Sequence, residues 1–186
     1  MILKAVWLLR HAETEWSRDR RHTGRTDVPL TDVGREAARA LRLRVADHPF
    51  ALVLASPLSR ALQTAELAGL TPQLRDDLVE FDYGAYEGIT TDEIRAQRPG
   101  WNLWRDGCPG GESAGDVGRR VDRVIAEVLA ASGDVALVAH GHVLRVLAAR
   151  WLEQPAAFAG RLLLDTGAIS VLGFERETRV IRSWNT

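Results

Sequence analysis

The stretch VWLLRHAETEWSRDRRHTGRTDVPL, from Val6 to Leu30, decides how the rest of the chain is interpreted. Its apolar run ends abruptly at Arg10 and His11, and an apolar run of this length near an N-terminus indicates a buried strand. In an open α/β sheet, ligands bind just beyond the carboxyl ends of the strands. An arginine suited to phosphate oxygens and an imidazole that can act as base, nucleophile or metal ligand are therefore expected where a ligand binds.

Composition and charge restrict the class of protein. The chain has 186 residues, 46% of them apolar, which is enough for one folded domain with a substantial core. Its 24 basic and 25 acidic residues give a net charge of −1, so no overall charge attracts nucleic acid or an anionic membrane. An anionic ligand must instead be held by a local cluster of arginines. We expect a single domain over residues 1–186, with no nucleic-acid partner and no membrane partner.

The cysteine content and the N-terminal segment indicate the compartment. Cys108 is the only cysteine, so no intramolecular disulfide can form. Arg10 interrupts the first apolar run, which therefore differs from a signal peptide, and no apolar stretch is long enough to span a bilayer. We expect a cytoplasmic protein.

Hydrophobic periodicity and capping residues predict strands that alternate with helices. Strands are expected at 6–10, 50–55 and 135–139, with a short extended piece at 70–77 and an antiparallel hairpin at 168–174 and 179–184. Helices are expected at 32–47, after Ser56-Pro57 with the proline at the first position, after Thr90, from Ser113, and at 143–152. This order predicts a three-layer α/β/α fold, whose mainly parallel sheet has an antiparallel C-terminal edge.

Three of the predicted strands end in a polar group that suits a phosphate. These groups are Arg10-His11, Ser56 with Arg60 just behind it, and His140-Gly141. In a parallel sheet such strand ends share one edge. Two helices are predicted to begin at that edge, and their N-termini would offer free N–H groups and a positive dipole. The sequence therefore predicts an electropositive site, although the protein as a whole is nearly neutral.

Four motifs in this order resemble the histidine phosphatase superfamily, the phosphoglycerate-mutase-like group. They are LLRHAETEW followed by TGRTDVPLT, SPLSRALQTA at 56–65, LVEFDYGAYEG at 78–88, and VAHG at 138–141. The chain departs from the family pattern at Ala12, where the family usually has glycine, and at Ser17, where it often has asparagine. Ser17 can still donate one hydrogen bond, but not two. The resemblance covers nearly the whole chain and implies a phosphoglycerate-mutase-like fold.

The resemblance also implies a role for each matched residue. His11 would be the nucleophile, Glu80 the proton donor, and Arg10, Arg60 and His140 the contacts of the transferred phosphoryl group. Further substrate contacts would come from Ser17, Thr23, Gly24, Tyr83 and Gly141. The phosphohistidine reaction that these roles describe needs no metal and no cofactor, because arginines balance the charge of the phosphate oxygens.

The segment at about 80–112 is aperiodic and glycine-rich, so we expect it to form an ordered loop or lid. Together with AHGHVLR at 139–145, it resembles the sedoheptulose-1,7-bisphosphatase and broad-specificity acid phosphatase branch of the superfamily. That resemblance implies a phosphomonoesterase that acts on sugar phosphates or bisphosphates. We expect Arg145, with Arg105 from the lid, to hold a second, distal phosphate; the alternative is a surface ion pair of Arg145.

Two other functions stay open. A phosphoglycerate mutase is disfavoured because Phe81 and Asp82 follow Glu80, where the mutase branch has an arginine, and because Asp82 would repel a second anionic group. A non-catalytic phosphate-binding or phosphohistidine-signalling domain is disfavoured because His11, Glu80 and His140 are all present.

The remaining histidines and the partners complete the prediction. His140 and His142 could hold a metal as a pair, but the sequence has no third cluster with metal-ligand spacing, so we expect no metal. His22 and His48 are expected at the surface. The expected partner is a small-molecule phosphate ester, and a homodimer stays open.

Overall fold

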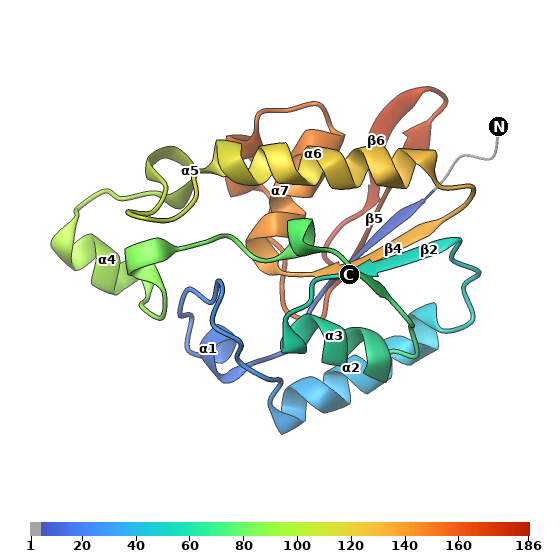
Figure 1. The fold of residues 1–186 in the computed structure, drawn as a ribbon, viewed down its shortest axis with the longest axis horizontal. Coiled ribbons are helices and arrows are strands. Elements are labelled where there is room, and N and C mark those ends of the chain that lie inside the picture. The colour runs from blue at the N-terminus through green and yellow to red at the C-terminus, as the bar shows by residue number, and fades with distance from the viewer. Residues whose placement is uncertain (1–4) are drawn as a thin grey trace.

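A six-stranded sheet forms the middle layer of the computed structural model, which describes residues 5–186. The strands lie in the order β3-β2-β4-β1-β5-β6 (Figure 1). Their bounds are β1 Val6–Arg10, β2 Leu52–Ala55, β3 Gln73–Leu74, β4 Val135–Ala139, β5 Ile169–Glu175 and β6 Thr178–Ser183. The α-helices are α1 Glu15–Arg18, α2 Asp32–Val45, α3 Ser59–Leu67, α4 Thr91–Gln97, α5 Leu103–Asp106, α6 Ala114–Ala130 and α7 Gly141–Trp151. Short 3₁₀ helices are η1 Asp76–Leu78, η2 Gly84–Tyr86 and η3 Ala156–Arg161.

The strand directions confirm the predicted fold class. β1, β2, β3 and β4 are mutually parallel where they pair, whereas β5 pairs antiparallel with β1, and β6 antiparallel with β5. The last two strands form the predicted C-terminal hairpin. The mainly parallel sheet therefore has an antiparallel edge, with helices on both faces (Figure 1).

Alternate side chains of the strands build a separate core on each face of the sheet. On one face, Val6 and Leu8 of β1 pack with α6 and α7 in a large cluster. On the other face, Leu9 packs with Leu41 and Val45 of α2. The central strand β4 is buried along its whole length because it contributes to both clusters. Successive side chains of a strand point to opposite faces, which is why one short apolar run serves two cores.

Capping residues start the helices largely where the sequence predicts. Thr31 caps α2, since its Oγ1 accepts a hydrogen bond from the N–H of Gly34. Thr90 and Ser113 each form a complete capping box at α4 and α6. The start of α3 is a correction: it begins at Ser59, so Pro57 precedes the helix instead of occupying its first position.

The predicted lid contains more helix than expected. Helices η2, α4 and α5 lie within it, and together with α1 they gather at one end of the sheet (Figure 1). The short helix α5 falls in the stretch that the sequence predicts as a loop, where Asn102 caps it through the N–H of Trp104. The ring of Trp101 is buried and donates to the carbonyl of Gly107, which ties the lid together.

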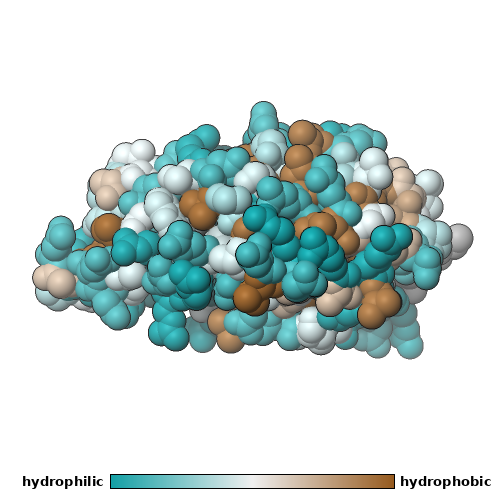
Figure 2. Space-filling view, turned by 90° about the horizontal axis from the view of Figure 1, so that it is seen from below, coloured by the Kyte–Doolittle hydropathy of each residue, from teal (hydrophilic) through white to brown (hydrophobic). Residues whose placement is uncertain are grey.

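The surface is mostly polar on the face that Figure 2 shows, where hydrophobic side chains occur in small, separate groups. Among the described residues, no helix is both long and apolar enough to cross a membrane.

Candidate active site

The carboxyl ends of β1, β2 and β4 bring together the polar groups that the sequence places after them. In the register of the sheet, Arg10 lies opposite Ala139. The backbone continues this pairing beyond the strands, since the N–H of His11 donates to Ala139 and the N–H of Ser56 donates to Val138. The ring centroids of His11 and His140 are consequently 5.2 Å apart.

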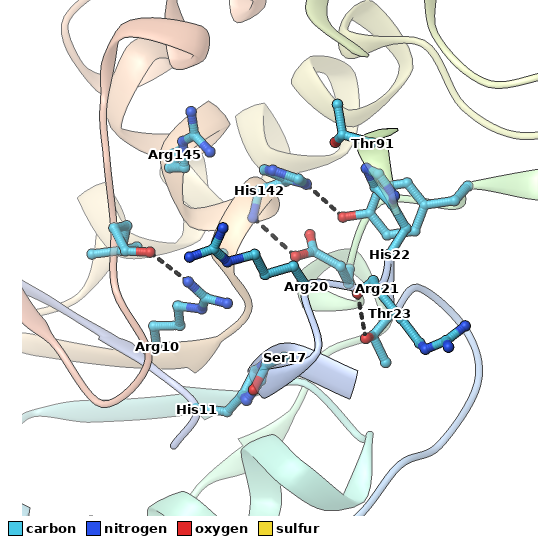
Figure 3. Close-up of a pocket in the computed structure, with 14 residues that line it drawn as sticks. Arg10, His11, Ser17, Arg20, Arg21, His22, Thr23, Thr91, His142 and Arg145 are labelled. Carbon is cyan, nitrogen blue, oxygen red and sulfur yellow. Dashed lines mark hydrogen bonds between the residues drawn. The ribbon is translucent and has the colours of Figure 1, made fainter. Parts of the chain in front are cut away.

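A cavity of about 300 Å³ opens in front of His11 (Figure 3). It is lined by Arg10, His11, Ser17, Arg20, Arg21, His22, Thr23, Glu80, Tyr83, Thr91, Gly141, His142, Arg145 and Leu164. Most of the predicted site residues are in this set. Gly24, Arg60 and His140 lie behind the cavity wall, and Arg105 lies elsewhere.

Hydrogen bonding fixes the tautomer of His11. Its Nδ1 is 2.7 Å from the carbonyl oxygen of Ala12, and because a carbonyl can only accept, Nδ1 carries the proton. The lone pair is therefore on Nε2. Burial lowers the pKa of His11 well below 6.5, and the charges of Arg10 and Arg60 lower it further. His11 thus presents a neutral imidazole with a free Nε2 lone pair, the form that a nucleophile needs.

Arg10 is poised beside this histidine with an unused donor. One terminal nitrogen donates to the carbonyl of Leu164 at 2.5 Å, whereas Nε is buried and has no partner among the described residues. Its second terminal nitrogen also has no partner among the described residues, and because Arg10 lines the cavity, this nitrogen is the donor that a ligand there can reach. Gly141 makes room for the guanidinium, because a Cβ there would come within 3.1 Å of it. An anionic oxygen would complete the bonding of Arg10.

Arg60 and His140 form a closed network behind the cavity. The guanidinium of Arg60 donates from Nε to Nδ1 of His140 at 3.1 Å, and its terminal nitrogens donate to the carbonyls of Thr23, Gly24 and Thr26. Nε2 of His140 then carries the proton and donates to Oγ of Ser56 at 2.7 Å. Every nitrogen of both side chains has a partner, but Arg60 makes four hydrogen bonds with five N–H groups, so one N–H remains on the terminal nitrogen that bonds Thr26.

Gly24 supports this network through its backbone. Its carbonyl accepts from Arg60, and its N–H donates to the carboxylate of Glu87. A Cβ at this position would lie 2.5 Å from the carbonyl oxygen of Phe81, so only glycine fits. Gly24 is therefore placed to hold Arg60, and it does not reach the cavity itself.

Glu80 occupies the N-terminus of α7. Its carboxylate accepts hydrogen bonds of 2.8–2.9 Å from the N–H groups of Phe81, His142 and Val143. Three backbone donors thus fix the position of the carboxyl group, which lines the cavity. Helix N-termini favour such a group because their N–H groups have no helical partner.

This arrangement corrects the prediction that two helix N-termini would offer free N–H groups at the site. At α7, Glu80 already takes the N–H groups of His142 and Val143, which leaves only Gly141 at the cavity. At α3, the carboxylate of Asp27 accepts from the N–H and the hydroxyl of Ser59. The protein's own carboxylates therefore satisfy most of the donors at both ends.

His22 is not a surface residue, contrary to prediction. It is 8% exposed, lines the cavity, and donates from Nδ1 to the carbonyl of Ile89 at 2.7 Å. Its ring packs against Tyr83, with centroids 4.8 Å apart. His48 is half-buried against Trp7 and bonds Asp134, which also differs from a free surface position. Nothing local in the sequence indicates the burial of His22, because the residues that cover it come from the lid.

His142 is a cavity residue that the sequence suggests only as a metal ligand. Tyr83 lies beside it, with the phenol oxygen 2.5 Å from Nδ1. His140 bonds Arg60 and Ser56 instead, so the two imidazoles have different partners. In the part of the chain that the structure describes, no group of three or more His, Cys, Asp or Glu residues could hold a metal ion.

Arginines dominate the charge at the cavity. Arg10, Arg20, Arg21 and Arg145 line it against one carboxylate, Glu80. Arg20 reaches across toward Arg10 (Figure 3) and has a left-handed backbone with φ of 58°, which is uncommon for a residue other than glycine.

The two arginines predicted to bind a distal phosphate differ in position. Arg145 lines the cavity, donates from Nε to the carbonyl of Ala159 and stacks on Trp104 at 4.7 Å. Burial lowers its pKa to about 10, so it remains a cation at neutral pH. Arg105 instead pairs with Asp106 on the exposed side of the lid, and the structure does not bring it to the cavity. The geometry therefore leaves Arg145 as the candidate for binding a distal phosphate, and Arg105 is not placed to do so.

The structure also removes one argument against a mutase. Asp82 does not line the cavity, because its carboxylate bonds Arg25 and the N–H of Gly84. Phe81 is fully buried in the core. The charge of Asp82 is therefore directed away from a bound substrate, and the repulsion expected from the sequence does not operate at the site.

Comparison with known proteins now identifies the family. The profile of the Histidine phosphatase superfamily (branch 1) matches residues 6–186. The chain belongs to this superfamily. An acid phosphatase of Mycobacterium tuberculosis is 45% identical over 179 residues, which cover 92% of this chain and 87% of that protein. The sedoheptulose 1,7-bisphosphatase of Saccharomyces cerevisiae is 35% identical over 183 residues, covering 77% of this chain and 66% of that protein.

A solved structure agrees with the family assignment. The structure of an open reading frame of Mycobacterium tuberculosis matches with a TM-score of 0.94 at 41% identity, and covers 98% of this chain and 97% of that one. The resemblance drawn from the four motifs is confirmed. The chain is an enzyme of the histidine phosphatase superfamily, and its phosphatase relatives support phosphatase activity.

Proposed function

We propose that this histidine phosphatase is a phosphomonoesterase that hydrolyses small phosphorylated metabolites, sugar phosphates and bisphosphates above all, through a phosphohistidine on His11. One observation carries the proposal. Nδ1 of His11 is committed to the carbonyl of Ala12, which leaves the Nε2 lone pair of a neutral ring beside a cavity lined by four arginines. A nucleophile next to positive charge suits attack on a phosphate ester.

In the first step, Nε2 of His11 attacks phosphorus in line with the ester oxygen. A nitrogen–phosphorus bond forms as the phosphorus–oxygen bond to the alcohol breaks. Glu80 enters this step as the carboxylic acid, gives its proton to the departing oxygen and becomes a carboxylate. The free terminal nitrogen of Arg10 and the N–H of Gly141 donate to the phosphoryl oxygens. Ser17 and Thr23 line the same cavity, but their hydroxyls donate to the carbonyls of Thr14 and Arg21. Arg60 contributes its positive charge to this step, and His140 holds Arg60 in position through a hydrogen bond.

In the second step, water attacks the phosphohistidine. Glu80, now a carboxylate, takes a proton from this water, the nitrogen–phosphorus bond breaks, and inorganic phosphate leaves with His11 restored. The steps use no metal and no cofactor, since arginines carry the positive charge that a metal would supply.

The charge of the cavity favours substrates with a second anionic group. Arg10 serves the transferred phosphoryl group, while Arg20 and Arg145 also line the cavity and have no carboxylate partner among the described residues. The Saccharomyces cerevisiae relative is named for a sugar bisphosphate. Arg145 is therefore proposed to hold the distal phosphate, and Tyr83 to line the path to it. The cytoplasmic location and a homodimer stay predictions.

Trapping the intermediate tests the proposal. The enzyme is mixed with ³²P-labelled fructose 1,6-bisphosphate in EDTA, quenched in alkali, and digested. Label on a peptide containing His11, together with release of phosphate, is the expected result. Label on another residue would refute the assignment, and activity that vanishes in EDTA and returns with zinc or magnesium would favour a metal mechanism. Conversion of 3-phosphoglycerate to 2-phosphoglycerate with 2,3-bisphosphoglycerate, in preference to hydrolysis, would show a mutase.

A further inference from the structure

Two histidines of the cavity wall have not been used by the mechanism. His22 and His142 lie on the same side of the cavity, away from Arg10 (Figure 3). Their ring centroids are 6.4 Å apart, and the ring planes are inclined by 34°. In each ring, Nδ1 is hydrogen-bonded to another group of the protein. Each Nε2 has no hydrogen-bond partner within residues 5–186.

The two rings are in opposite tautomers. Nδ1 of His22 donates to the carbonyl of Ile89, so Nε2 of His22 holds the lone pair. Tyr83 is 2% exposed, and its hydroxyl oxygen lies 2.5 Å from Nδ1 of His142, with no other acceptor among the described residues. Assigning the hydroxyl proton to Nδ1 of His142 gives it the one acceptor that the described residues offer. Nε2 of His142 consequently carries the proton.

Both rings stay neutral at physiological pH. Burial lowers the pKa of His22, and it lowers the pKa of His142 well below 6.5, where the charge of Arg145 adds to the effect. Within the described residues, the buried side-chain nitrogens and oxygens without a partner are Trp7 Nε1 and Arg10 Nε. Neither Nε2 belongs to that set, so both are open to the cavity. The wall thus presents one acceptor and one donor side by side.

The surrounding space suits the alcohol part of an ester. A smaller cavity of about 140 Å³ lies next to the first and has His22, Thr91 and His142 as shared wall residues. Its further walls include Trp101 and Trp104. An ester whose phosphoryl group is at His11 would have its alcohol part within the first cavity, whose wall includes the two histidines.

We propose that His22 and His142 form a hydroxyl-recognition pair, in which Nε2–H of His142 donates to, and Nε2 of His22 accepts from, one hydroxyl group of the alcohol part of the substrate. A hydroxyl is the group that both donates and accepts a hydrogen bond, so it matches this pair and an amine cation or a carboxylate does not. Tyr83 is the positioning residue, since it holds His142 in the donor tautomer. The inference rests on the proposed function and narrows its substrates to polyols and sugars.

A matched pair of substrates isolates the hydroxyl. Glycerol 2-phosphate and isopropyl phosphate have the same carbon skeleton, and only the first has hydroxyl groups. The measured quantity is the ratio of kcat/KM for glycerol 2-phosphate to kcat/KM for isopropyl phosphate. His142→Leu and His22→Leu should each lower this ratio about 3- to 10-fold, the effect of one neutral hydrogen bond. His142→Gln, whose amide can donate from a similar place, should restore most of it.

The controls separate recognition from other causes. A disturbed Glu80 would slow both alkyl esters alike and leave the ratio unchanged. Because both histidines contact one hydroxyl, the double variant should lose less than the product of the two single losses. If each single variant changes the ratio by less than twofold from the wild-type value, the proposed hydroxyl-recognition pair is wrong.

The wild-type enzyme provides a test that does not depend on a variant folding. Nitrogen-15 NMR of the histidine rings at pH 7 should show the Nε2–H tautomer for His142 and the Nδ1–H tautomer for His22. The opposite tautomer at either ring would overturn the inference. Absence of hydrolysis of both esters, with no phosphohistidine formed, would instead refute the proposed function.

Discussion

His11 and His140 differ in one property that decides their chemistry. They follow neighbouring parallel strands, their rings are 5.2 Å apart, and both are buried. Burial lowers the pKa of each well below 6.5. The carbonyl of Ala12 engages one nitrogen of His11, whereas Arg60 and Ser56 engage both nitrogens of His140. Hydrogen bonding, rather than burial or place in the sheet, therefore distinguishes His11, the proposed nucleophile, from His140.

The arginines beside these histidines show the same contrast. Arg60 is 0% exposed, and all three of its nitrogens donate to the protein. Arg10 keeps its Nε without a partner among the described residues. The Arg60 half of the site is thus held mainly by hydrogen bonds within the protein, whereas the Arg10 half keeps unused donors. We expect the first half to hold the geometry of the site and the second half to contact the substrate.

Removing each histidine gives the largest expected effect. His11→Ala should lower kcat by about 10⁴-fold or more, because the covalent route is gone. His140→Ala should lower it by about 10²-fold, since it disturbs the position of Arg60 but leaves the nucleophile. Steady-state assays with p-nitrophenyl phosphate measure both. His48→Ala, at the opposite end of the sheet, serves as the control. Equal reductions in kcat for the two variants, or label trapped on His140, would contradict the assignment of His11 as the nucleophile.

The next effect concerns the proton that His11 cannot supply. Glu80→Gln keeps the size of the side chain but removes the acid, so kcat/KM for alkyl phosphates should fall by about 10²- to 10⁴-fold. p-Nitrophenyl phosphate should lose much less, because its leaving group needs little protonation. The ratio of the two losses is the measurement. If both substrates lose equally, another group is the acid.

Arg145 sharpens the contrast among the arginines. Arg145→Ala should reduce kcat/KM for fructose 1,6-bisphosphate about tenfold to a hundredfold more than for p-nitrophenyl phosphate, since a charge-assisted contact contributes about 1.5–3 kcal/mol. Arg105→Ala is the matched control, because Arg105 pairs with Asp106 outside the cavity. A wild-type enzyme without preference for bisphosphates, or equal losses on both substrates, would rule out a distal-phosphate role.

The smallest effect is on stability, where the two histidines should behave alike. Each has a folded-state pKa below its unfolded value of about 6.5, so the unfolded chain binds more protons as the pH falls. The free energy of unfolding should therefore be highest above pH 6.5 and decline below it, by up to about 1.4 kcal/mol per pH unit for each histidine. Urea unfolding from pH 7.5 to 5.5 should show a shallower decline in His140→Asn. An unchanged slope would contradict the burial of a neutral His140.

Local sequence patterns were sufficient for the main strands, for the long helices and for the edge where the site lies, but not for α5. Continuous apolar runs predict β1 and β4, and the caps Thr31, Thr90 and Ser113 start their helices through bonds three residues away. Parallel strands then bring Arg10, His11 and His140 to one edge without further information. These features depend on neighbours in the chain, so the chain alone determines them.

Contacts between distant segments decided the rest. Arg60 meets His140 across 80 positions, and Tyr83 meets His142 across 59. The same long-range packing buries His22 under the lid. It also pairs the N–H of Ser59, at the start of α3, with the carboxylate of Asp27, and it leaves Arg105 outside the cavity. The sequence determined which side chains stand at the strand ends. Only the tertiary structure decided which nitrogens are already bonded and which are free, because a hydrogen bond depends on the position of both partners.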